Sequence, residues 1–552
     1  MQTVNIASAV DDMAQSRPDE VAIFEPTGSS VEQQATYRRW TYRELEAASN
    51  EIAAGLLELG LQKGDRTALM VTPSLELFGL TFGLFKAGIV PVMIDPGIGI
   101  KKMGACLESA APQGFIGVPK AHIARLLFGW QRGKLNKVVT VGPRLFWGGK
   151  TLKQVRELGR KSEHLGKLAE TQGEDIAAIL FTSGSTGPPK GVVYRHRHFA
   201  AQVEWIQSRF QIEPGEVDLP TFPLFALFDP ALGMTTVLPK MNPTKPAKVN
   251  PENILGAIDA FNVTTMFGSP ALLNRVGRYG EAQGIKVPSL RRVISAGAPV
   301  PAPTMAQWHQ MMPESGEILP PYGATESLPV ACISSREILG ETWAKTEQGL
   351  GVCVGSPFAE LDVAIIPISD QPIENFEESS RLDTEEIGEI CVRGAVVTDQ
   401  YWNADRHNKL GKMKSPEGVW HRMGDLGYFD EQGRLWFCGR KAHRVQIGSK
   451  CLFSIPTEAP FNTHPKVFRT ALVGPTNRDN KRVAALCVEF EQGLSPQEQT
   501  QTLAELKEIR DSFENLKMIS VLLPHPSFPV DIRHNAKINR EALKEWAEKE
   551  LQ

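Results

Sequence analysis

Short apolar runs alternate with longer amphipathic segments along the first half of the chain. The run 176–181 is wholly apolar, and the apolar runs 67–71 and 89–94 are of similar length, so each predicts a buried strand. Residues 40–60 show helical spacing after Thr41 and Glu44, a pair that can cap a helix. The segment 77–88 predicts a helix that ends at a glycine. Alternation of this kind favours an α/β fold of layered sheets and helices.

The pattern changes character near residues 439–441. The turn-rich segment 424–433 lies between alternating neighbours and predicts a hairpin. Beyond it we expect strands at 471–473 and 483–488 and helices at 501–515 and 540–550. We therefore predict a large N-terminal domain (1–440) of layered α/β subdomains with a β-rich part, and a small α+β C-terminal domain (441–552).

The stretch from Thr182 to Gly191 follows the predicted strand 176–181 and combines hydroxyls, glycines and one lysine. Glycines allow close approach of the backbone to a ligand, and successive amide groups in such turns form anion-binding concavities. Lys190 adds a positive charge. This predicts a polyphosphate-binding loop made by Thr182, Ser183, Gly184, Ser185, Thr186, Gly187 and Lys190.

Two other loop motifs built from similar residues are excluded by spacing. A Walker loop needs Gly-Lys-Ser/Thr before a helix, whereas Lys190 follows two prolines and precedes a glycine. A serine hydrolase elbow needs Gly-x-Ser-x-Gly, which the chain lacks. A polar turn that binds nothing is the structural alternative.

Composition and charge narrow the class of protein further. The 552 residues are 42% hydrophobic, with 60 basic and 63 acidic side chains and a formal charge of −3, so no global field recruits nucleic acid. Seven scattered cysteines without Cys-x-x-Cys indicate neither disulfide framework nor zinc site. The start of the chain lacks signal-peptide character, so we expect a cytoplasmic protein. The apolar segments 75–94 and 221–239 are interrupted by charges, among them Asp229, and indicate core.

Four further stretches place ligand-binding chemistry beside the predicted loop. Glu326, in the turn of Tyr322, Gly323, Ala324 and Thr325, is a natural Mg²⁺ ligand next to phosphates. The small-residue turn of Gly297, Ala298 and Pro299 could let a flat base lie against backbone. Asp425, expected in a turn, could bind two ribose hydroxyls or only stabilise that turn, and Arg440 could reach the ribose or α-phosphate. Lys537 precedes the last predicted helix.

In order and content, these stretches resemble the adenylate-forming superfamily of acyl-CoA synthetases, peptide-synthetase adenylation domains and firefly-type luciferases. The resemblance covers nearly the whole chain and includes 388–394 and 535–538, where Ala536 replaces the usual glycine. It implies an enzyme that makes an acyl-AMP from ATP and a carboxylate with Mg²⁺. The implied catalytic residues are Thr182, Glu326 and Lys537, with Lys537 on a mobile C-terminal domain.

Two departures put the usual thiol transfer in doubt. The family's hinge carries two carboxylates and a lysine, but here the segment reads Gly439-Arg440-Lys441-Ala442-His443-Arg444. The histidine of the aromatic gate falls on Ala226. An acyl-AMP without an external thiol can be captured by a hydroxyl on the same substrate. The chain also resembles the β-lactone synthetases of bacterial long-chain olefin biosynthesis, which implies that a long-chain 2-alkyl-3-hydroxy acid becomes a β-lactone.

Two alternative functions stay open, a long-chain acyl-CoA synthetase and a catalytically silent acyl-adenylate-binding scaffold. The base that would deprotonate the hydroxyl is not identified, and His196, His198 and His443 are candidates by chemistry alone. Residues 120–167 carry twelve Lys or Arg and two Glu, interleaved with aromatic and leucine side chains. This segment is either an ordinary solvated face or a contact for an anionic membrane or an acidic partner, and other enzymes of the olefin pathway are expected partners.

Overall fold

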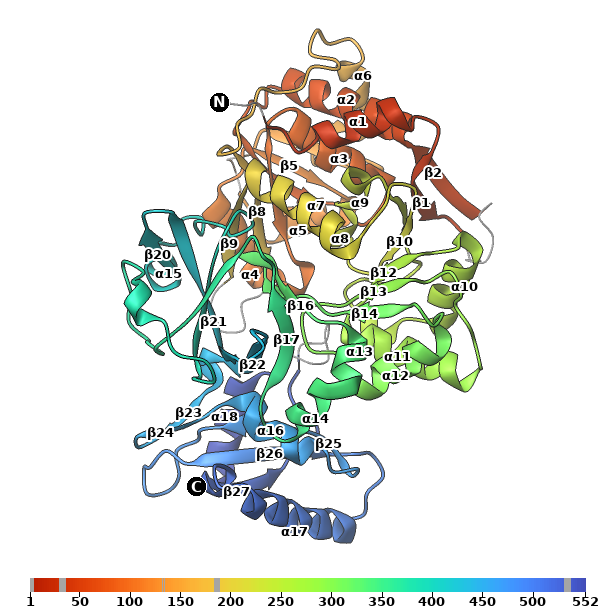
Figure 1. Ribbon diagram of the computed structural model, residues 1–552. Helices are drawn as coiled ribbons and strands as arrows, with labels where there is room; N and C mark the ends of the chain where they lie inside the picture. Colours follow the sequence, from red (N-terminus) through yellow and green to blue (C-terminus); the bar gives the residue numbers. More distant parts are fainter. Residues whose placement is uncertain (1–3, 29–35, 132, 134, 183–188, 531–537) are drawn as a thin grey trace.

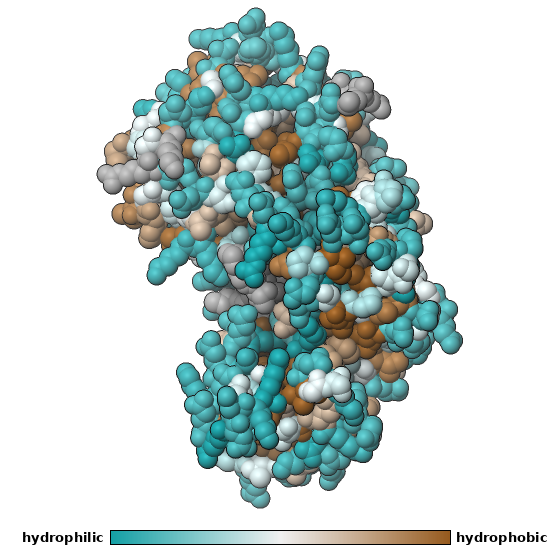
Figure 2. All heavy atoms as spheres, turned by 90° about the vertical axis from the view of Figure 1, so that its left-hand side faces the viewer, coloured by the Kyte–Doolittle hydropathy of each residue, from teal (hydrophilic) through white to brown (hydrophobic). Residues whose placement is uncertain are grey.

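The computed structural model describes residues 4–28, 36–131, 133, 135–182, 189–530 and 538–552. Three large sheets occupy the upper and middle parts of the molecule, and the C-terminal residues form a smaller unit at its foot (Figure 1). Figure 2 shows that the face turned to the viewer is mainly hydrophilic and that the molecule narrows above the C-terminal unit. The predicted α/β fold class is confirmed.

The first sheet is parallel except for its last strand, which is antiparallel to its neighbour. Apolar runs build it because both of its faces are covered by helices. Its order is β7(Lys150–Thr151), β6(Lys137–Thr140), β5(Gly114–Gly117), β3(Arg66–Met70), β4(Val90–Ile94), β8(Ile176–Thr182) and β9(Lys190–Arg195). The strands predicted at 67–71, 89–94 and 176–181 are confirmed.

The second sheet is parallel apart from its terminal strand β2. Its order is β14(Glu317–Leu319), β13(Arg292–Ile294), β12(Thr265–Phe267), β10(Val217–Pro220), β11(Thr235–Val237), β1(Val21–Pro26) and β2(Tyr37–Thr41). Because the strands are parallel, residues 221, 268, 295 and 320, which follow β10, β12, β13 and β14, meet at one edge. Such an edge is where ligands bind in open α/β sheets.

The third sheet is antiparallel and supplies the β-rich part that the sequence predicts. Its order is β15(Tyr322–Ala324), β16(Ser327–Cys332), β17(Val352–Pro357), β22(Leu435–Arg440), β21(Gly418–Phe429), β19(Gly388–Arg393) and β18(Asp362–Ile366), with β20(Lys412–Ser415) also paired to β21. The hairpin expected around 424–433 is the β21–β22 pair.

Most helices of the N-terminal part lie against the first two sheets, whereas α15 packs against β20 and β21 of the third sheet (Figure 1). Thr41 and Glu44 form the predicted capping box of α2, and α3 is followed by Gly88 at a φ of +66°. The bounds are α1(Ser8–Ser16), α2(Tyr42–Glu58), α3(Leu75–Lys86), α4(Ile100–Ala110), α5(Pro119–Leu127), α6(Leu152–Gly159), α7(His196–Phe210), α8(Pro223–Ala226), α9(Asp229–Leu232), α10(Pro251–Phe261), α11(Pro270–Ala282), α12(Ala302–Met311), α13(Ser335–Glu337), α14(Trp343–Glu347) and α15(Asp405–Gly411).

The C-terminal residues form a two-stranded sheet, β23(Val445–Ile447) with β24(Lys450–Leu452), and a three-stranded sheet, β25(Val467–Val473), β26(Ala484–Phe490) and β27(Ile519–Pro524). Helices α16(Ser454–Asn462), α17(Pro496–Ser512) and α18(Arg540–Glu550) accompany them. Two hydrophobic clusters, around Phe461 and around Leu543, draw all their buried members from residues after 441. This separate core supports the boundary at 441, which stays a proposal.

Two expectations about the chain as a whole can be compared with the structure. Within the described ranges, no helix combines the length and the apolar character that a membrane crossing requires. Each of the seven cysteines lies in a described range and is free, and six of them are buried. Burial agrees with a hydrophobic packing role for these thiols.

Candidate active site

The predicted phosphate loop connects two neighbouring strands of the first sheet. Thr182, the last residue of β8, is the register partner of Lys190, the first residue of β9. The loop residues Ser183, Gly184, Ser185, Thr186 and Gly187 lie outside the described residues. Lys190 is half-buried, burial lowers its pKa, and its Nζ lies 5.3 Å from the centroid of the Tyr401 ring. A cavity of about 330 Å³ opens beside Lys190.

The motif Tyr322 to Glu326 forms the hairpin between β15 and β16, with Thr325 and Glu326 at its turn. The Tyr401 hydroxyl donates to Glu326 Oε1 at 2.6 Å, and the Thr398 amide donates to the Glu326 carbonyl at 2.9 Å. The Tyr194 hydroxyl donates to the Thr325 carbonyl at 2.5 Å. Because Tyr194 belongs to β9, these bonds hold the turn against the strand that carries Lys190.

The surroundings of Glu326 keep its carboxylate ionised. Burial alone would raise its pKa, but interactions with His421, the Tyr401 hydroxyl and Lys412 outweigh burial, and the pKa of Glu326 is lowered. Lys412 Nζ lies 5.5 Å from the centroid of the Tyr401 ring, and burial lowers the pKa of Lys412 to about 8. Tyr401 therefore lies between two lysines while it donates to the carboxylate.

Asp425 lies in a buried strand, which corrects the prediction that places it in a turn. It is the residue of β21 that pairs with Arg440 of β22. Its neighbour Gly424 has a φ of +67°, so the glycine-rich composition reflects an irregular strand, and a bulge follows at Leu426 and Gly427. The alternative role of Asp425 as a turn-stabilising residue is therefore wrong.

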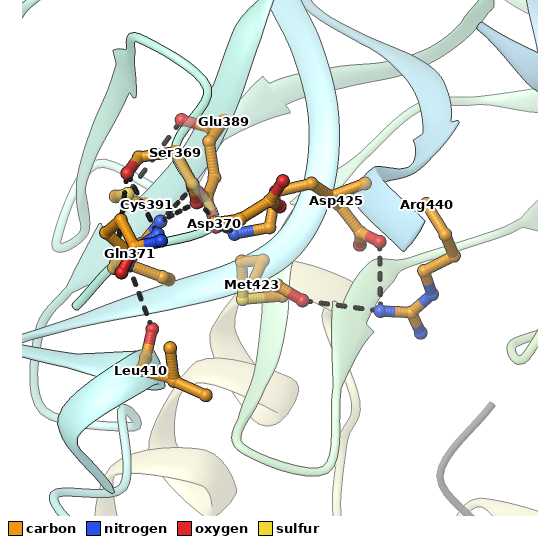
Figure 3. Close-up of polar contacts among 12 residues, drawn as sticks. Ser369, Asp370, Gln371, Glu389, Cys391, Leu410, Met423, Asp425 and Arg440 are labelled. Carbon is orange, nitrogen blue, oxygen red and sulfur yellow. Dashed lines mark hydrogen bonds and ion pairs between the residues drawn. The ribbon is translucent and has the colours of Figure 1, made fainter. Parts of the chain in front are cut away.

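Both oxygens of Asp425 have partners. The Tyr322 hydroxyl donates to Oδ2 at 2.8 Å, and Arg440 Nη1 lies 2.9 Å from Oδ1, as Figure 3 shows for the arginine. Arg440 also donates to the Met423 carbonyl at 3.3 Å. Burial raises the pKa of Asp425, while Arg440 and Tyr322 act in the opposite direction. The structure thus brings Tyr322 together with Asp425 and Arg440, which lie more than a hundred positions further along the sequence.

The predicted base-binding turn follows β13 at the binding edge of the second sheet. Gly297 adopts a φ of +97°, which a side chain would strain, and Gly297 and Pro299 are exposed while Ala298 is half-buried. Gly323 lies in β15, the first strand of the β15–β16 hairpin. A Cβ at Gly323 would lie only 2.6 Å from the Ser327 carbonyl oxygen, so close packing requires glycine there.

A second cavity, of about 60 Å³, lies beside the binding edge and is lined mainly by apolar side chains. Phe267 and Ile294 end β12 and β13, and Pro321 immediately precedes Tyr322. Phe225 and Phe228 come from the segment of α8 and the start of α9, where Ala226 is fully buried. The cavity therefore lies beside the segments that lead into the 297–299 turn and into Tyr322.

A buried ionic cluster holds the segment that follows Arg440 (Figure 3). Arg422 Nη2 lies 2.6 Å from Glu389 Oε2, and both side chains are only 1% exposed. Lys441 Nζ lies 2.8 Å from Glu389 Oε1 and donates to the Ser369 carbonyl. Arg444 pairs with Asp370 at 2.5 Å. Lys441 and Arg444 belong to the segment whose sequence departs from the family's hinge motif. Their ion pairs thus hold this segment against the third sheet and its loops.

Sequence reasoning missed Tyr401, Lys412 and His421, which surround Glu326. They lie 75 to 95 residues further along, in no motif of their own, so no spacing could connect them to the turn. Lys537, predicted to be catalytic, lies outside the described residues. Of the proposed bases, His196 and His198 are buried, and none of the three histidines lines the apolar cavity.

The turns at the sheet edges, the strand pair that frames the loop and the surroundings of Glu326 carry the motifs by which the sequence resembles one class of enzyme. The chain belongs to the AMP-binding enzyme family, whose model matches residues 10–402. It is 46% identical over 549 residues to the olefin beta-lactone synthetase of Xanthomonas campestris pv. campestris, covering 98% of this chain and 97% of that protein. It is 47% identical over 555 residues to the olefin beta-lactone synthetase of Stenotrophomonas maltophilia, covering 99% of each.

Solved structures share the fold over the full length. The amide bond synthetase McbA from Marinactinospora thermotolerans matches with a TM-score of 0.78 and 22% identity, over 98% of this chain and 99% of that one. ATP-bound MatB from Rhodopseudomonas palustris matches with a TM-score of 0.78 and 21% identity, over 100% of both chains. At such identities the likeness shows the fold, and the activity must be argued from the sequence relatives and the site.

Proposed function

We propose that the protein is an ATP-dependent β-lactone synthetase. It activates a long-chain 2-alkyl-3-hydroxy acid as its acyl-AMP, and the β-hydroxyl then displaces AMP to give a β-lactone, with pyrophosphate released in the first step. The observation that carries the proposal is the identity of 46% and 47%, over nearly the whole chain, to two olefin beta-lactone synthetases. A tethered hydroxyl has a high effective concentration, and the activated acyl group offsets the ring strain.

The nucleotide would bind between the first two sheets and the β15–β16 hairpin. The loop from Thr182 to Gly187 and Lys190 would hold the phosphates, and the Gly297 to Pro299 turn would contact adenine. Tyr322 and Thr325 would line the site. Asp425 would accept hydrogen bonds from the ribose hydroxyls. Its position as a buried acceptor between Tyr322 and Arg440 supports this role. Lys537 would stabilise charge that develops on the phosphates during adenylation.

Glu326 fits a role as a Mg²⁺ ligand. Its carboxylate is held ionised, and Tyr401 engages only Oε1 in the described contacts. The described residues contain no cluster of three or more His, Cys, Asp or Glu suited to a metal. A single carboxylate agrees with Mg²⁺, which usually takes one or two carboxylates and completes its shell with substrate phosphates and water. When bound, Mg²⁺ would neutralise charge on the phosphates.

Product analysis tests the main proposal against the acyl-CoA synthetase alternative. The enzyme is incubated with ATP and a synthetic 2-alkyl-3-hydroxy acid, and the products are analysed by mass spectrometry and NMR. We expect a product that has lost one water, with AMP release, and no dependence on CoA. Robust thioester formation from a plain fatty acid and CoA would overturn the proposal. Absence of any ATP-dependent product would instead favour the silent scaffold.

The segment 120–167 supports a further proposal, that this face contacts an anionic membrane surface. Leu127 is 76% exposed and Phe146 is 80% exposed, and Leu126, Phe128 and Leu145 are exposed as well. Trp130, by contrast, is buried and anchors the segment to the core. Exposed apolar side chains among lysines and arginines suit the boundary between headgroups and acyl chains.

Vesicle sedimentation tests the membrane contact. The wild-type protein should sediment with phosphatidylglycerol vesicles and much less with phosphatidylcholine vesicles. Leu127→Ser with Phe146→Ser should abolish sedimentation without changing turnover of a short, soluble substrate. Equal sedimentation of the variant would overturn the proposal, and loss of binding to another enzyme of the olefin pathway with vesicle binding intact would assign the face to a protein partner.

A further inference from the structure

Two carboxyl groups lie on the wall of the apolar cavity and belong to no predicted motif. Asp218 is in β10 and Asp229 is the first residue of α9, and each is only 4% exposed. They are the titratable side chains among the described residues that line this cavity. A buried charged group is costly unless it is paired or neutralised, so their presence in an apolar cavity requires an explanation.

The two carboxyls are hydrogen-bonded to each other. Two carboxylates in hydrogen-bond contact cannot both be ionised, so the pair shares a proton. Burial raises the pKa of both groups, and it raises that of Asp218 well above the ordinary value for an aspartate. The mutual hydrogen bond raises the pKa of Asp218 and lowers that of Asp229, so the shared proton lies on Asp218. The pair therefore gives up its two protons in separate steps, and it still holds one shared proton when it carries a single negative charge.

Neighbouring side chains fix the pair on one side. The Thr236 hydroxyl donates to Asp229 Oδ2 at 2.8 Å. Arg292 acts on Asp218 through its charge, but Arg292 is itself paired with Glu216 and donates to the Thr265 hydroxyl at 2.8 Å. The nearby Tyr42 hydroxyl is directed to the Met234 carbonyl at 2.8 Å. The charges that face the pair are thus already balanced.

One buried oxygen of the pair receives no hydrogen bond from any described group outside the pair. Asp218 Oδ1 is buried and accepts no hydrogen bond from such a group, although the other carboxyl is held by Thr236. A plain alkyl chain in the cavity would leave this oxygen unsatisfied, whereas a hydroxyl on the chain would donate to it. The cavity is therefore better matched to an acid that carries a hydroxyl than to an unsubstituted fatty acid.

We propose that the Asp218–Asp229 pair binds the β-hydroxyl of the substrate and accepts its proton during ring closure. This inference rests on the proposed function. The β-oxygen forms a bond to the acyl carbon, and the bond from that carbon to the AMP phosphate oxygen breaks, with its electron pair leaving on AMP. The hydroxyl proton passes to the ionised carboxylate of the pair, so that both carboxyl groups are then protonated. The pair, then neutral, returns one proton to water after the lactone leaves.

The histidines considered from the sequence fit this role less well. His196 Nδ1 accepts from the Ile6 amide at 3.2 Å, and His198 Nδ1 accepts from the Arg195 amide at 3.0 Å. Burial lowers the pKa of His196 to about 4 and of His198 to about 3. Both rings therefore have one nitrogen engaged and bind a proton weakly.

Single-turnover kinetics separate the two chemical steps and so test the role of the pair. Wild type, Asp218→Asn and the double variant Asp218→Asn/Asp229→Asn are mixed with ATP and a 2-alkyl-3-hydroxy acid, and acyl-AMP and β-lactone are quantified after rapid quenching. We expect ring closure to slow by about 100-fold or more, the size of a general-base effect, while adenylation stays within a few-fold. Acyl-AMP should accumulate in the variants.

Pyrophosphate exchange with a plain fatty acid, which has no hydroxyl, shows that each variant is folded. If exchange survives and ring closure is unchanged, or if both steps fall equally, the inference is wrong. Should the variants fail to fold, the pH dependence of ring closure in wild type decides: the rate must fall as the pair takes up its second proton, and a rate independent of pH overturns the inference. A wild type that forms no lactone at all would overturn the proposed function itself.

Discussion

The surroundings of Glu326 and the apolar cavity both hold carboxyl groups away from bulk water, but they hold them in opposite ways. Glu326 is partnered by a tyrosine hydroxyl and lies near Lys412, and its pKa is lowered. Asp218 and Asp229 are partnered mainly by each other, and the pKa of each is raised. The first arrangement keeps a permanent charge, which suits the proposed role of Glu326 as a Mg²⁺ ligand beside phosphates. The second keeps a group that is ready to take up a proton.

The largest expected effect is a loss of adenylation, the step assigned to the proposed nucleotide site. Lys537→Ala should slow adenylation by about 100- to 1000-fold, because one preorganised cation near developing phosphate charge contributes on that scale. Pyrophosphate exchange measures the step. Lys517→Ala removes an exposed lysine of the same C-terminal part and serves as the matched control. Undiminished exchange in Lys537→Ala would remove this lysine from the mechanism.

Next in size is the loss of the proposed ribose acceptor. Asp425→Asn should raise the KM for ATP by about 10- to 100-fold, since a hydrogen bond to a charged group contributes about 1.5–3 kcal/mol. The KM for the hydroxy acid should change little. Initial rates at varied ATP test this, with Asp362→Asn, a half-exposed carboxylate of β18, as control. A change confined to the acid would place Asp425 with the other substrate.

The dependence of stability on pH sharpens the comparison. The raised pKa of the Asp218–Asp229 pair gives stability that is present at low pH and lost as pH rises through the folded-state value. Relative to wild type, Asp218→Asn/Asp229→Asn should therefore gain more than about 1 kcal/mol in the free energy of unfolding between about pH 5 and pH 7. Urea titrations at both values measure it, and a constant difference would contradict a shared proton.

Buried histidines change the dependence of stability on pH in the opposite direction, both in wild type and in the double variant. Burial lowers the pKa of His198 and of His421 to about 3, whereas an unfolded histidine titrates near pH 6.5. The unfolded chain thus binds more protons below that value, and stability falls as pH falls. Because this contribution is common to wild type and variant, it cancels in their difference.

The smallest effect concerns the positioning of the pair. Thr236→Val removes the donor to Asp229 and should reduce stability by about 1 kcal/mol while slowing ring closure several-fold. Thr81→Val is the matched control, since it removes an equally buried hydroxyl that donates to the Leu77 carbonyl in α3. Its stability loss should be similar and its ring closure unchanged. Equal kinetics in the two variants would give Thr236 a purely structural role.

Local patterns in the sequence predicted much of the fold. The strand at 176–181, the capped helix at Thr41 and the hairpin at 424–433 follow from contacts between near neighbours, which composition and periodicity reflect. Motif order also predicted that Tyr322, Asp425 and Arg440 act together, and the structure brings them into contact. The strand position of Asp425 was missed because an irregular, glycine-containing strand has the composition of a turn.

The contacts that depend on parallel pairing could not be predicted. Asp229 is visible in the sequence only as a charge inside an apolar segment, and Asp218 does not stand out at all. They meet because α9 returns the chain to β11, whose Thr236 pairs in register with Asp218 of β10. Tyr401 and Lys412 reach Glu326 through tertiary packing of the third sheet on the first, for which the spacing of residues carries no signal.

Arg440 and Lys441 are joined by one peptide bond, yet their side chains are held by different partners. Arg440 is held by Asp425, which would receive the ribose, and Lys441 is held by Glu389 beneath the third sheet. If ribose binds Asp425 as proposed, it would meet a carboxylate that already pairs with Arg440 and Tyr322, whereas the Lys441–Glu389 pair would keep both of its partners. The proposed binding of nucleotide would thus change the surroundings of Arg440 and leave those of Lys441, one peptide bond away, as they are.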